Sequence, residues 1–333
     1  MAATMSDVAR LAGVSAKTVS NVINDHPYVR HETRERVERA ISQLDYTLNL
    51  AARSLRSGRS GVIGLAVPAL SVAYFAELAE GVIAAAEPHD LAVLVERTGT
   101  VERERAFLRS ARLQHMDGLI LNPMDDASAG GRSLALPIPM VLLGERVLGR
   151  PTDHVTIDQV GAARTATSHL LALGRRRIAA IGAHDGGEDD SVARMRLVGY
   201  RAALLEHDIV YDANLVVQAD LWHRSNGAIA TRELLQRKVA FDAIFAFNDT
   251  LALGAMRVLQ EAGLRVPDDV AVVGFDNLDE SAYSIPSLTT VDTGRAEIAR
   301  SAVQLLVDRI AGASEPRLRV TAHTLVTRES SGG

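Results

Sequence analysis

The chain of 333 residues contains no cysteine, which excludes disulfides, thiolate nucleophiles and zinc sites built on cysteine. No apolar run approaches the length of a membrane span, and the first residues lack the basic-then-apolar pattern of a secretion signal. These absences predict a soluble cytoplasmic protein that makes no membrane contact. The chain exceeds a typical single domain, so two or three domains are expected.

Lysine is scarce, because Lys17 and Lys238 are the only two and arginine supplies the remaining positive charge. The charge is also unevenly placed. Residues 1–60 hold nine Lys/Arg against six Asp/Glu, although the whole chain has a net charge of −5. A basic segment ahead of an acidic remainder indicates a DNA-binding module joined to a separate regulatory domain.

Residues 4–24 predict two short helices separated by Gly13. Thr4 suits an N-cap, with Asp7 as an acidic variant of the capping box. Gly13 suits the left-handed residue that ends a helix, and Ser15 suits the cap of the next one. The second helix turns valines inward and keeps small, polar or basic side chains outside, as a helix that reads a major groove requires. An ordinary helical hairpin is the alternative interpretation.

A third helix is predicted over residues 32–44 by an apolar stripe at helical spacing, which would complete a three-helix head. Residues 48–60 allow barely two turns of helix before a Gly/Ser linker. A helix that short is unstable alone in water, so we expect it to be ordered only by a partner, such as DNA or a second copy of the chain.

From residue 62 onwards, apolar runs alternate with amphipathic helical patterns. Buried continuous strands that alternate with helices predict parallel sheets covered on both faces. The stretch is long enough for two such sheets, and a cleft between them is the expected ligand site. The predicted strands lie near residues 62–67, 91–95, 118–121, 140–143, 155–157, 178–181, 215–217, 243–247, 270–274, 288–291 and 320–326.

Several short motifs recur in the order typical of one protein family. They are the segment from Asp7 to Ser15 with Thr18-Val-Ser20, Ala52-Arg-Ser-Leu55 before Gly61-x-Ile-Gly64, His169-Leu-Leu-x-Leu-Gly174-Arg, Arg196-Leu-x-Gly-Tyr200, Phe247-Asn-Asp249, Val266-Pro-x-Asp-Val270, Val273-Gly-Phe-Asp276 and Leu288-Thr-Thr-Val291. Together they resemble the lactose/galactose repressor family of bacterial transcription regulators, from about residue 4 to 330. The resemblance implies a repressor that binds DNA as a homodimer on a pseudo-palindromic operator in the cytoplasm, at the nucleoid.

The resemblance also implies a domain plan. An all-α helix-turn-helix head (1–47) is followed by a hinge helix and linker (48–60) and by an α/β body (61–333) of two parallel-sheet subdomains, similar to periplasmic binding proteins. The chain is expected to cross between the subdomains three times. The first subdomain takes about 61–157 plus 291–319, and the second takes about 158–290 plus 320–330.

For DNA, the resemblance implies that Ala16, Lys17 and Asn21 read bases, since lysine can donate to guanine and asparagine can pair with adenine. Arg53 and Leu55 fall in the hinge, where paired leucines of a dimer would wedge into the minor groove. The residues expected to contact phosphates are Thr4, Thr18, Ser20, Asn24 and Tyr28.

For the effector, polar groups after strand ends and aromatic side chains suit a ligand with several hydroxyls. A sugar is expected, and a nucleoside, a purine or another metabolite acting as co-repressor is the alternative. Asn248 has a simpler interpretation as a helix cap, Asp276 as a turn cap and Trp222 as part of the core. The expected effector residues are Arg196, Trp222, Asn248, Asp249, Asp276, Tyr74 and Phe75.

Two other classes of protein fit the sequence less well. An enzyme on a doubly wound fold is disfavoured, because no nucleotide-binding glycine loop and no His-x-x-x-His pair is present. His184, Asp185, Glu188 and Asp190 have no spacing typical of a metal site. A periplasmic binding protein would need a secretion signal and no head. We therefore expect no catalytic residues, no metal and no cofactor.

Overall fold

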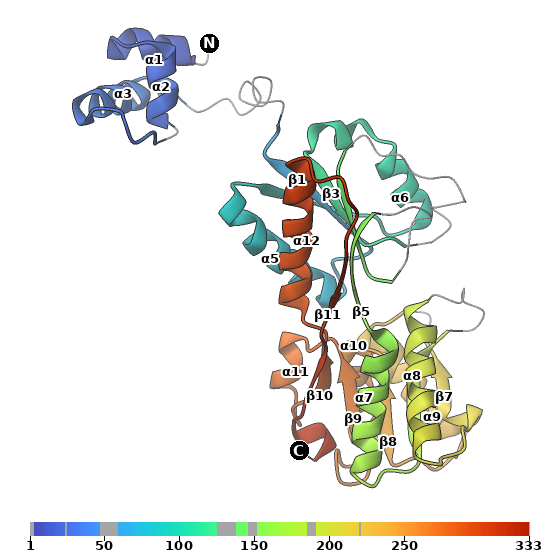
Figure 1. Ribbon diagram of the computed structural model, residues 1–333. Helices are drawn as coiled ribbons and strands as arrows, with labels where there is room; N and C mark the ends of the chain where they lie inside the picture. Colours follow the sequence, from blue (N-terminus) through green and yellow to red (C-terminus); the bar gives the residue numbers. More distant parts are fainter. Residues whose placement is uncertain are drawn as a thin grey trace. The chain divides into compact units, whose positions relative to one another are not determined.

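The structure is a computed structural model that describes residues 3–23, 25–46, 59–124, 138–145, 152–184, 191–219 and 221–332. The chain divides into two compact units, a head (Met1–Ser60) and a body (Gly61–Gly333) (Figure 1).

The described part of the head consists of α1 (Met5–Ala12), α2 (Ala16–Ile23) and α3 (His31–Gln43). The predicted capping box is confirmed: the Thr4 hydroxyl accepts from the backbone N–H of Asp7, whose carboxylate accepts from the backbone N–H of Thr4. Both contacts satisfy N–H groups that have no partner inside a helix.

The turn between α1 and α2 is made by Gly13, whose φ of 66° lies in the left-handed region that favours glycine. Val8, Val19 and Val37, one from each helix, are fully buried in a common core. The apolar spacing of the sequence therefore becomes the packed face of each helix, and the polar face of α2 points outwards.

Within the described residues, the body contains two six-stranded sheets. The first sheet has the order β11 (Leu318–Thr321), β5 (Asp153–Ile157), β4 (Met140–Leu143), β3 (Gly118–Leu121), β1 (Val62–Val67) and β2 (Ala92–Arg97). The second has the order β12 (Thr324–Val326), β10 (Thr289–Asp292), β9 (Ala271–Phe275), β8 (Ala243–Ala246), β6 (Ile178–Ala183) and β7 (Val216–Gln218). Neighbouring strands are parallel, except β10 with β12. Strands β3, β4, β6, β8 and β9 are buried along their whole length, which explains why they appear in the sequence as continuous apolar runs.

The described helices of the body are α5 (Ala73–Ala86), α6 (Val101–Leu108), α7 (Gln159–Ala172), α8 (Val192–Glu206), α9 (Arg224–Gln236), α10 (Asp249–Glu261), α11 (Asp279–Tyr283) and α12 (Arg295–Ile310). Helices pack on the sheets in pairs: α5 with α12 on the first sheet, α7 with α8 and α9 with α10 on the second (Figure 1). The close approach of α9 and α10 depends on glycine, because a Cβ on Gly254 would lie 2.0 Å from the Arg224 carbonyl oxygen.

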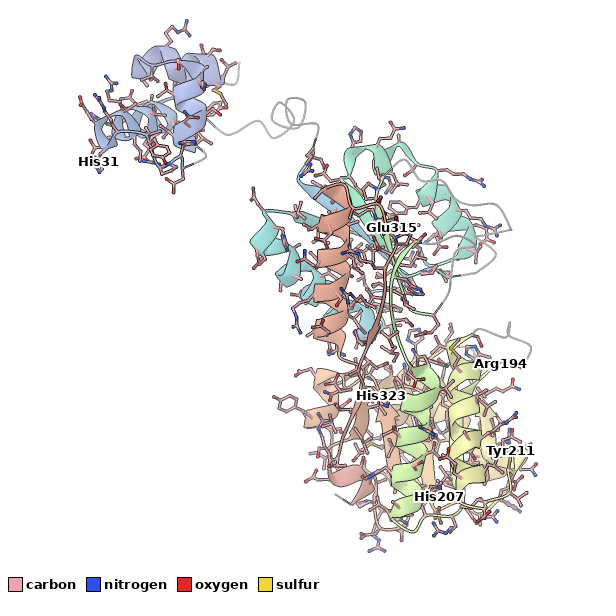
Figure 2. All side chains as sticks on the ribbon, viewed as in Figure 1. His31, Arg194, His207, Tyr211, Glu315 and His323 are labelled. Atoms are coloured by element: carbon pink, nitrogen blue, oxygen red, sulfur yellow. The ribbon has the colours of Figure 1, made fainter. Side chains whose placement is uncertain are left out.

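The chain passes between the two sheets three times along the described residues: after β5, after β10 and between β11 and β12. We call the sheets with their helices the first and second subdomains. The expectation of a single last strand near residues 320–326 was wrong, since two short strands lie there, one in each sheet. Residues 322 and 323 make the crossing, and His323 Nε2 lies 3.2 Å from Thr165 Oγ1 of α7 (Figure 2).

Candidate functional site

The outer face of α2 carries the residues predicted to read bases. Ala16 and Lys17 are exposed and Asn21 is half-buried, whereas Val19 and Val22 on the opposite face are buried. The sequence therefore folds into a helix with one packed face and one polar face that is available to a partner. A side chain such as lysine on this face can reach the acceptor groups of guanine in a major groove.

The predicted phosphate contacts have differing environments. The Thr18 and Ser15 hydroxyls lie 2.9 Å apart, so Thr18 takes part in the N-cap of α2. The Thr4 hydroxyl donates to the Asp7 carboxylate within its own cap, and Tyr28 is 88% exposed. Ser20 is half-buried on α2. Asn24 and the two hinge residues, Arg53 and Leu55, lie outside the described residues.

A cavity of about 450 Å³ lies in the body between the two subdomains. Its walls come from the segments that follow the carboxyl ends of strands: Asn122 after β3, Gly144 after β4, His184 after β6, Asn248 after β8 and Asp276 after β9. Loops at this edge of a parallel sheet are where open α/β folds bind ligands. A volume of this size is in the range typical of small-molecule sites.

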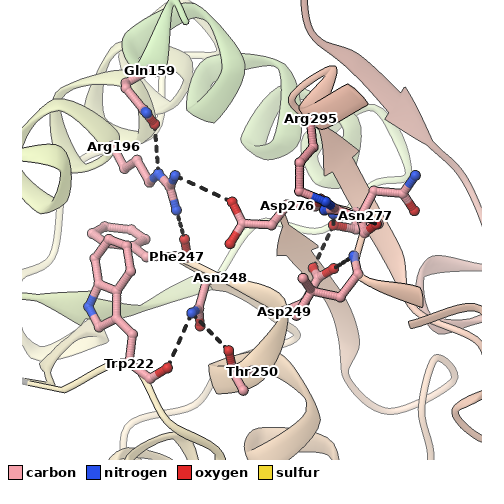
Figure 3. Close-up of polar contacts among 12 residues, drawn as sticks. Gln159, Arg196, Trp222, Phe247, Asn248, Asp249, Thr250, Asp276, Asn277 and Arg295 are labelled. Atoms are coloured by element: carbon pink, nitrogen blue, oxygen red, sulfur yellow. Dashed lines mark hydrogen bonds and ion pairs between the residues drawn. The ribbon is translucent and has the colours of Figure 1, made fainter. Parts of the chain in front are cut away.

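Arg196 of α8 is the centre of the polar network in this cavity (Figure 3). Its Nε donates to Gln159 Oε1 at 2.9 Å, and its Nη1 donates to the Phe247 carbonyl oxygen. The guanidinium packs 3.6 Å from the ring centroid of Phe275, which supports its position further. Arginine carries five N–H donors, so these two hydrogen bonds leave donors for a ligand.

Asp276 faces Arg196, with its Oδ1 3.7 Å from Arg196 Nη2. Burial raises the pKa of Asp276 to about 6, although the positive charges of Arg196 and Arg295 act in the opposite direction. Its φ of 107° is a conformation that residues other than glycine rarely adopt. The chain therefore presents a carboxylate to the cavity at a backbone position that needs support from its neighbours.

Trp222 and Asn248 form an adjoining part of the wall. Trp222 Nε1 donates to the Gly182 carbonyl oxygen at 3.1 Å, and its ring meets Phe247 edge to face at 6.2 Å. Asn248 is both a lining residue and the N-cap of α10, because its Oδ1 accepts from the Leu251 backbone N–H at 2.8 Å. Its Nδ2 donates to the Trp222 carbonyl oxygen at 3.2 Å. The capping interpretation is therefore correct for Asn248, and it also holds the residue at the cavity.

Asp249, also predicted to bind the effector, does not line the cavity. Its carboxylate is fully buried and accepts from the Leu278 backbone N–H at 2.8 Å and from the hydroxyls of Ser281 and Thr290 at 2.7 and 2.5 Å. Burial raises the pKa of Asp249 to about 7, and these hydrogen bonds oppose the rise. The prediction of direct contact is corrected: Asp249 holds the segment that follows Asp276.

Tyr74 and Phe75 of α5 lie on the wall from the first subdomain, with their rings edge to face at 5.3 Å. Burial raises the pKa of the Tyr74 hydroxyl, which therefore stays neutral and able to donate. Thr293 also lines the cavity, and its buried Oγ1 has no hydrogen-bond partner among the described residues. An unpaired buried hydroxyl at this wall is a further group that a ligand can satisfy.

Three polar lining residues, Glu145, Thr156 and Gln159, were missed from the sequence. Gln159 Nε2 donates to Glu145 Oε1 at 2.9 Å, and the Thr156 hydroxyl donates to the other oxygen of Glu145. This chain of contacts joins Arg196 of the second subdomain to Glu145 of the first. Gln159 lies two residues after the carboxyl end of β5, as Asn248 lies two residues after that of β8, so the same rule would have found it as well.

No group of histidine, aspartate and glutamate suited to a metal ion occurs in the part of the chain that the structure describes. His184 is exposed at the cavity, and Asp185, Glu188 and Asp190 lie outside the described residues. None of the helices in the described ranges combines the length and the apolar character that a membrane crossing needs.

Comparison with known proteins matches two regions of the chain. Residues 4–49 match the family of bacterial regulatory proteins of the lacI type, and residues 167–331 match a periplasmic binding protein-like domain. The chain is 38% identical to the HTH-type transcriptional regulator CelR of Thermobifida fusca, over 98% of both chains. It is 33% identical to the ribose operon repressor of Haemophilus influenzae, again over 98% of both.

Comparison with solved structures also finds similarity to transcription regulators. A regulator of the LacI family from Sanguibacter keddieii is 50% identical, with a TM-score of 0.76 over 83% of this chain and 100% of that one. A complex of CelR with cellobiose is 36% identical, with a TM-score of 0.72 over 98% and 99% of the two chains. The lac repressor dimer bound to operator is 30% identical, with a TM-score of 0.85 over 99% of each.

Proposed function

Because the chain belongs to the lacI family of bacterial regulatory proteins, we propose that it is a transcriptional repressor whose affinity for an operator is set by a small effector bound in the body. The observation that carries the proposal is the joint presence, in one chain, of a head with a polar α2 face and a body with a polar cavity between two subdomains. This function makes and breaks no covalent bond, and it places the protein on DNA in the cytoplasm.

In the proposed DNA complex, α2 enters the major groove. Lys17 donates to guanine, Asn21 pairs with adenine and Ala16 contacts a thymine methyl group. A homodimer presents two heads to the two halves of a pseudo-palindromic operator. The similar lac repressor has been solved as a dimer bound to operator. Leu55 of each copy wedges into the minor groove at the centre, and Arg53 lies beside it.

The proposed effector is a sugar. Arg196 and Asp276 offer donors and an acceptor to hydroxyl groups, and Trp222 offers an aromatic surface to the apolar face of a pyranose. A cavity of about 450 Å³ accommodates a disaccharide, and the similar regulator CelR has been solved with cellobiose. A nucleoside or purine is the alternative effector, since the Tyr74 and Phe75 rings on the opposite wall suit a flat base.

Effector binding is transmitted because the cavity has walls from both subdomains. A ligand that contacts both walls favours one arrangement of the subdomains over another by its differential affinity for the two. The first subdomain begins at β1, directly after residues 48–60. A change in its position therefore acts on the hinge, whose marginal stability makes it sensitive to a coupling of about 1–3 kcal/mol.

The proposal is tested in two steps with the full chain. Selection from random duplex DNA should enrich a pseudo-palindromic site, and the absence of any enriched sequence would refute the DNA-binding role. Fluorescence anisotropy on that site is then repeated with cellobiose, ribose, adenosine and hypoxanthine. We expect one sugar to change the operator dissociation constant about 5- to 150-fold. A response to the purines and to neither sugar would transfer the proposal to the alternative effector.

A further inference from the structure

An ion pair of the first subdomain, which lies outside the cavity, forms hydrogen bonds with the segment that carries Asp276. Residues 276–279 connect β9 to α11 in the second subdomain, and we call them the effector loop. Glu77 of α5 and Arg295 of α12 belong to the first subdomain, whose helices α5 and α12 pack together. Their side chains form an ion pair and are mostly buried, at 27% and 18% exposure.

Each partner of this pair also contacts the effector loop directly. Arg295 Nη1 donates to the Asp276 carbonyl oxygen at 2.8 Å, and its Nη2 lies 3.4 Å from that of Asn277. Glu77 Oε1 accepts from the backbone N–H of Asp279 at 3.3 Å. The Arg295 guanidinium thus donates to backbone carbonyl groups of the loop, and the Glu77 carboxylate accepts from a backbone N–H of the loop. The pair therefore matches both kinds of polar group in this stretch of backbone.

The backbone of the effector loop needs this support. Asp276 and Asn277 have φ angles of 107° and 48°, which cost free energy in residues other than glycine and persist only where the surroundings impose them. Within the second subdomain, the backbone N–H groups of residues 276–278 donate to the Val291 carbonyl oxygen, the Thr290 hydroxyl and the Asp249 carboxylate, respectively. The Asn277 side chain also donates to Asp292 and accepts from Arg328. The contacts of Arg295 and Glu77 come from the other subdomain. Residues of both subdomains therefore stabilise the loop conformation that directs Asp276 to the cavity.

We propose that Glu77 and Arg295 are a positioning pair that couples the effector loop to the first subdomain, so that ligand binding at Asp276 is transmitted to the subdomain that continues from the head. This inference rests on the proposed function of the cavity. Neither residue lines the cavity, so neither touches the ligand. The ligand acts on the side chain of Asp276 while the pair acts on the backbone of the same residue, and the loop between them carries the signal.

Because the pair lies outside the cavity, a substitution in it should change the effect of the ligand on operator affinity without changing the affinity for the ligand itself. Glu77→Gln keeps an oxygen for the Asp279 amide but removes the charge that holds Arg295. The effector affinity should change by less than about threefold, because the cavity wall is intact, whereas the effect of the ligand on operator affinity should fall at least about fivefold. Glu80→Gln is the matched control, since Glu80 is exposed and lies one turn further along the same helix.

The experiment uses the full chain, the DNA site selected above and cellobiose as the probe. Cellobiose affinity is measured by Trp222 fluorescence, and operator affinity is measured with and without saturating cellobiose. A variant in which coupling is unchanged, or in which sugar affinity and coupling fall by the same factor, would overturn the proposal. Arg295→Lys, which keeps the charge but loses the paired donors, provides a second variant if Glu77→Gln does not fold, and it should also reduce coupling.

A second readout is independent of any ligand. Amide hydrogen exchange of the unliganded chain should be faster at residues 276–279 in Glu77→Gln than in the wild type, and unchanged in Glu80→Gln. If cellobiose leaves the wild-type operator affinity unchanged, its role as effector fails, and the exchange rates still decide whether the pair holds the loop. Equal exchange in all three proteins would contradict the positioning role.

Discussion

Replacing Arg196 with methionine removes the central charge of the cavity while nearly preserving the length of the side chain. Arg196 is 4% exposed, so little water can reach the acceptor atoms that lose its guanidinium. The acceptors on Gln159 and Phe247 each lose a donor, and an unsatisfied buried acceptor costs about 1–3 kcal/mol. Because the Gln159 side chain can turn to another partner, we expect these contacts to lower the free energy of unfolding by about 2–4 kcal/mol.

The loss should also depend on pH, through Asp276. The folded-state pKa of this residue, about 6, lies above its ordinary value of 3.8, so the folded chain binds more protons and its stability falls as pH rises from 4 to 6. Loss of the opposite charge of Arg196 raises the pKa further, so in the variant the fall continues to higher pH. At about 1.4 kcal/mol per pH unit, the variant should lose about 1–3 kcal/mol more at pH 8 than at pH 5.

Urea unfolding followed by the fluorescence of Trp222, the only tryptophan, measures this directly, because that residue lies at the same cavity. Arg257→Met is the matched control, since Arg257 forms an exposed ion pair with Glu261. Such a pair contributes about 0–1 kcal/mol, and we expect no pH dependence between pH 5 and 8. Equal destabilisation of Arg196→Met at both pH values would refute the electrostatic coupling of Arg196 to Asp276.

Three further results are expected. Protonation of Asp276 removes an acceptor for the ligand, so sugar affinity measured by Trp222 fluorescence should fall about tenfold from pH 7 to pH 5, and Asp276→Asn should abolish this dependence. Lys17→Ala should weaken binding to the selected operator by about 1–3 kcal/mol in anisotropy titrations, and weaken binding to random DNA less; equal losses would contradict base reading. Leu55→Ala should likewise weaken specific binding far more than non-specific binding, because the minor-groove wedge acts only at the operator centre.

The head could be predicted from the sequence because its signals are local. Thr4 and Asp7 are three residues apart, and Gly13 alone ends α1, so the capping box and the turn follow from short-range geometry. The alternation of strands and helices in the body could also be predicted from the sequence, because strands buried on both faces are continuous apolar runs. The third crossing was expected, but the division of the last strand into β11 and β12 was missed, because the break between them is only two residues long and changes no apolar period.

The cavity was predicted in part. Asn248 and Asp276 were found by their position after strand ends, but the same rule wrongly placed Asp249 in contact with the ligand. The orientation of Asp249 depends on Leu278 and Thr290, which are 29 and 41 residues away. The pairing of Glu77 with Arg295, 218 residues apart, has no local signal either. Contacts of this range are set by the packing of distant elements within each subdomain, which the sequence pattern alone does not specify.

If one cavity in the body controls the affinity of the head for DNA, the effector and the operator must change each other's binding by the same factor. The operator dissociation constant is measured with and without saturating cellobiose, and the cellobiose dissociation constant with and without operator. Both ratios should agree, at about 5- to 150-fold, because coupling between two sites acts equally in both directions. Binding of the sugar with no change in operator affinity, or an equal change for random DNA, would contradict the account.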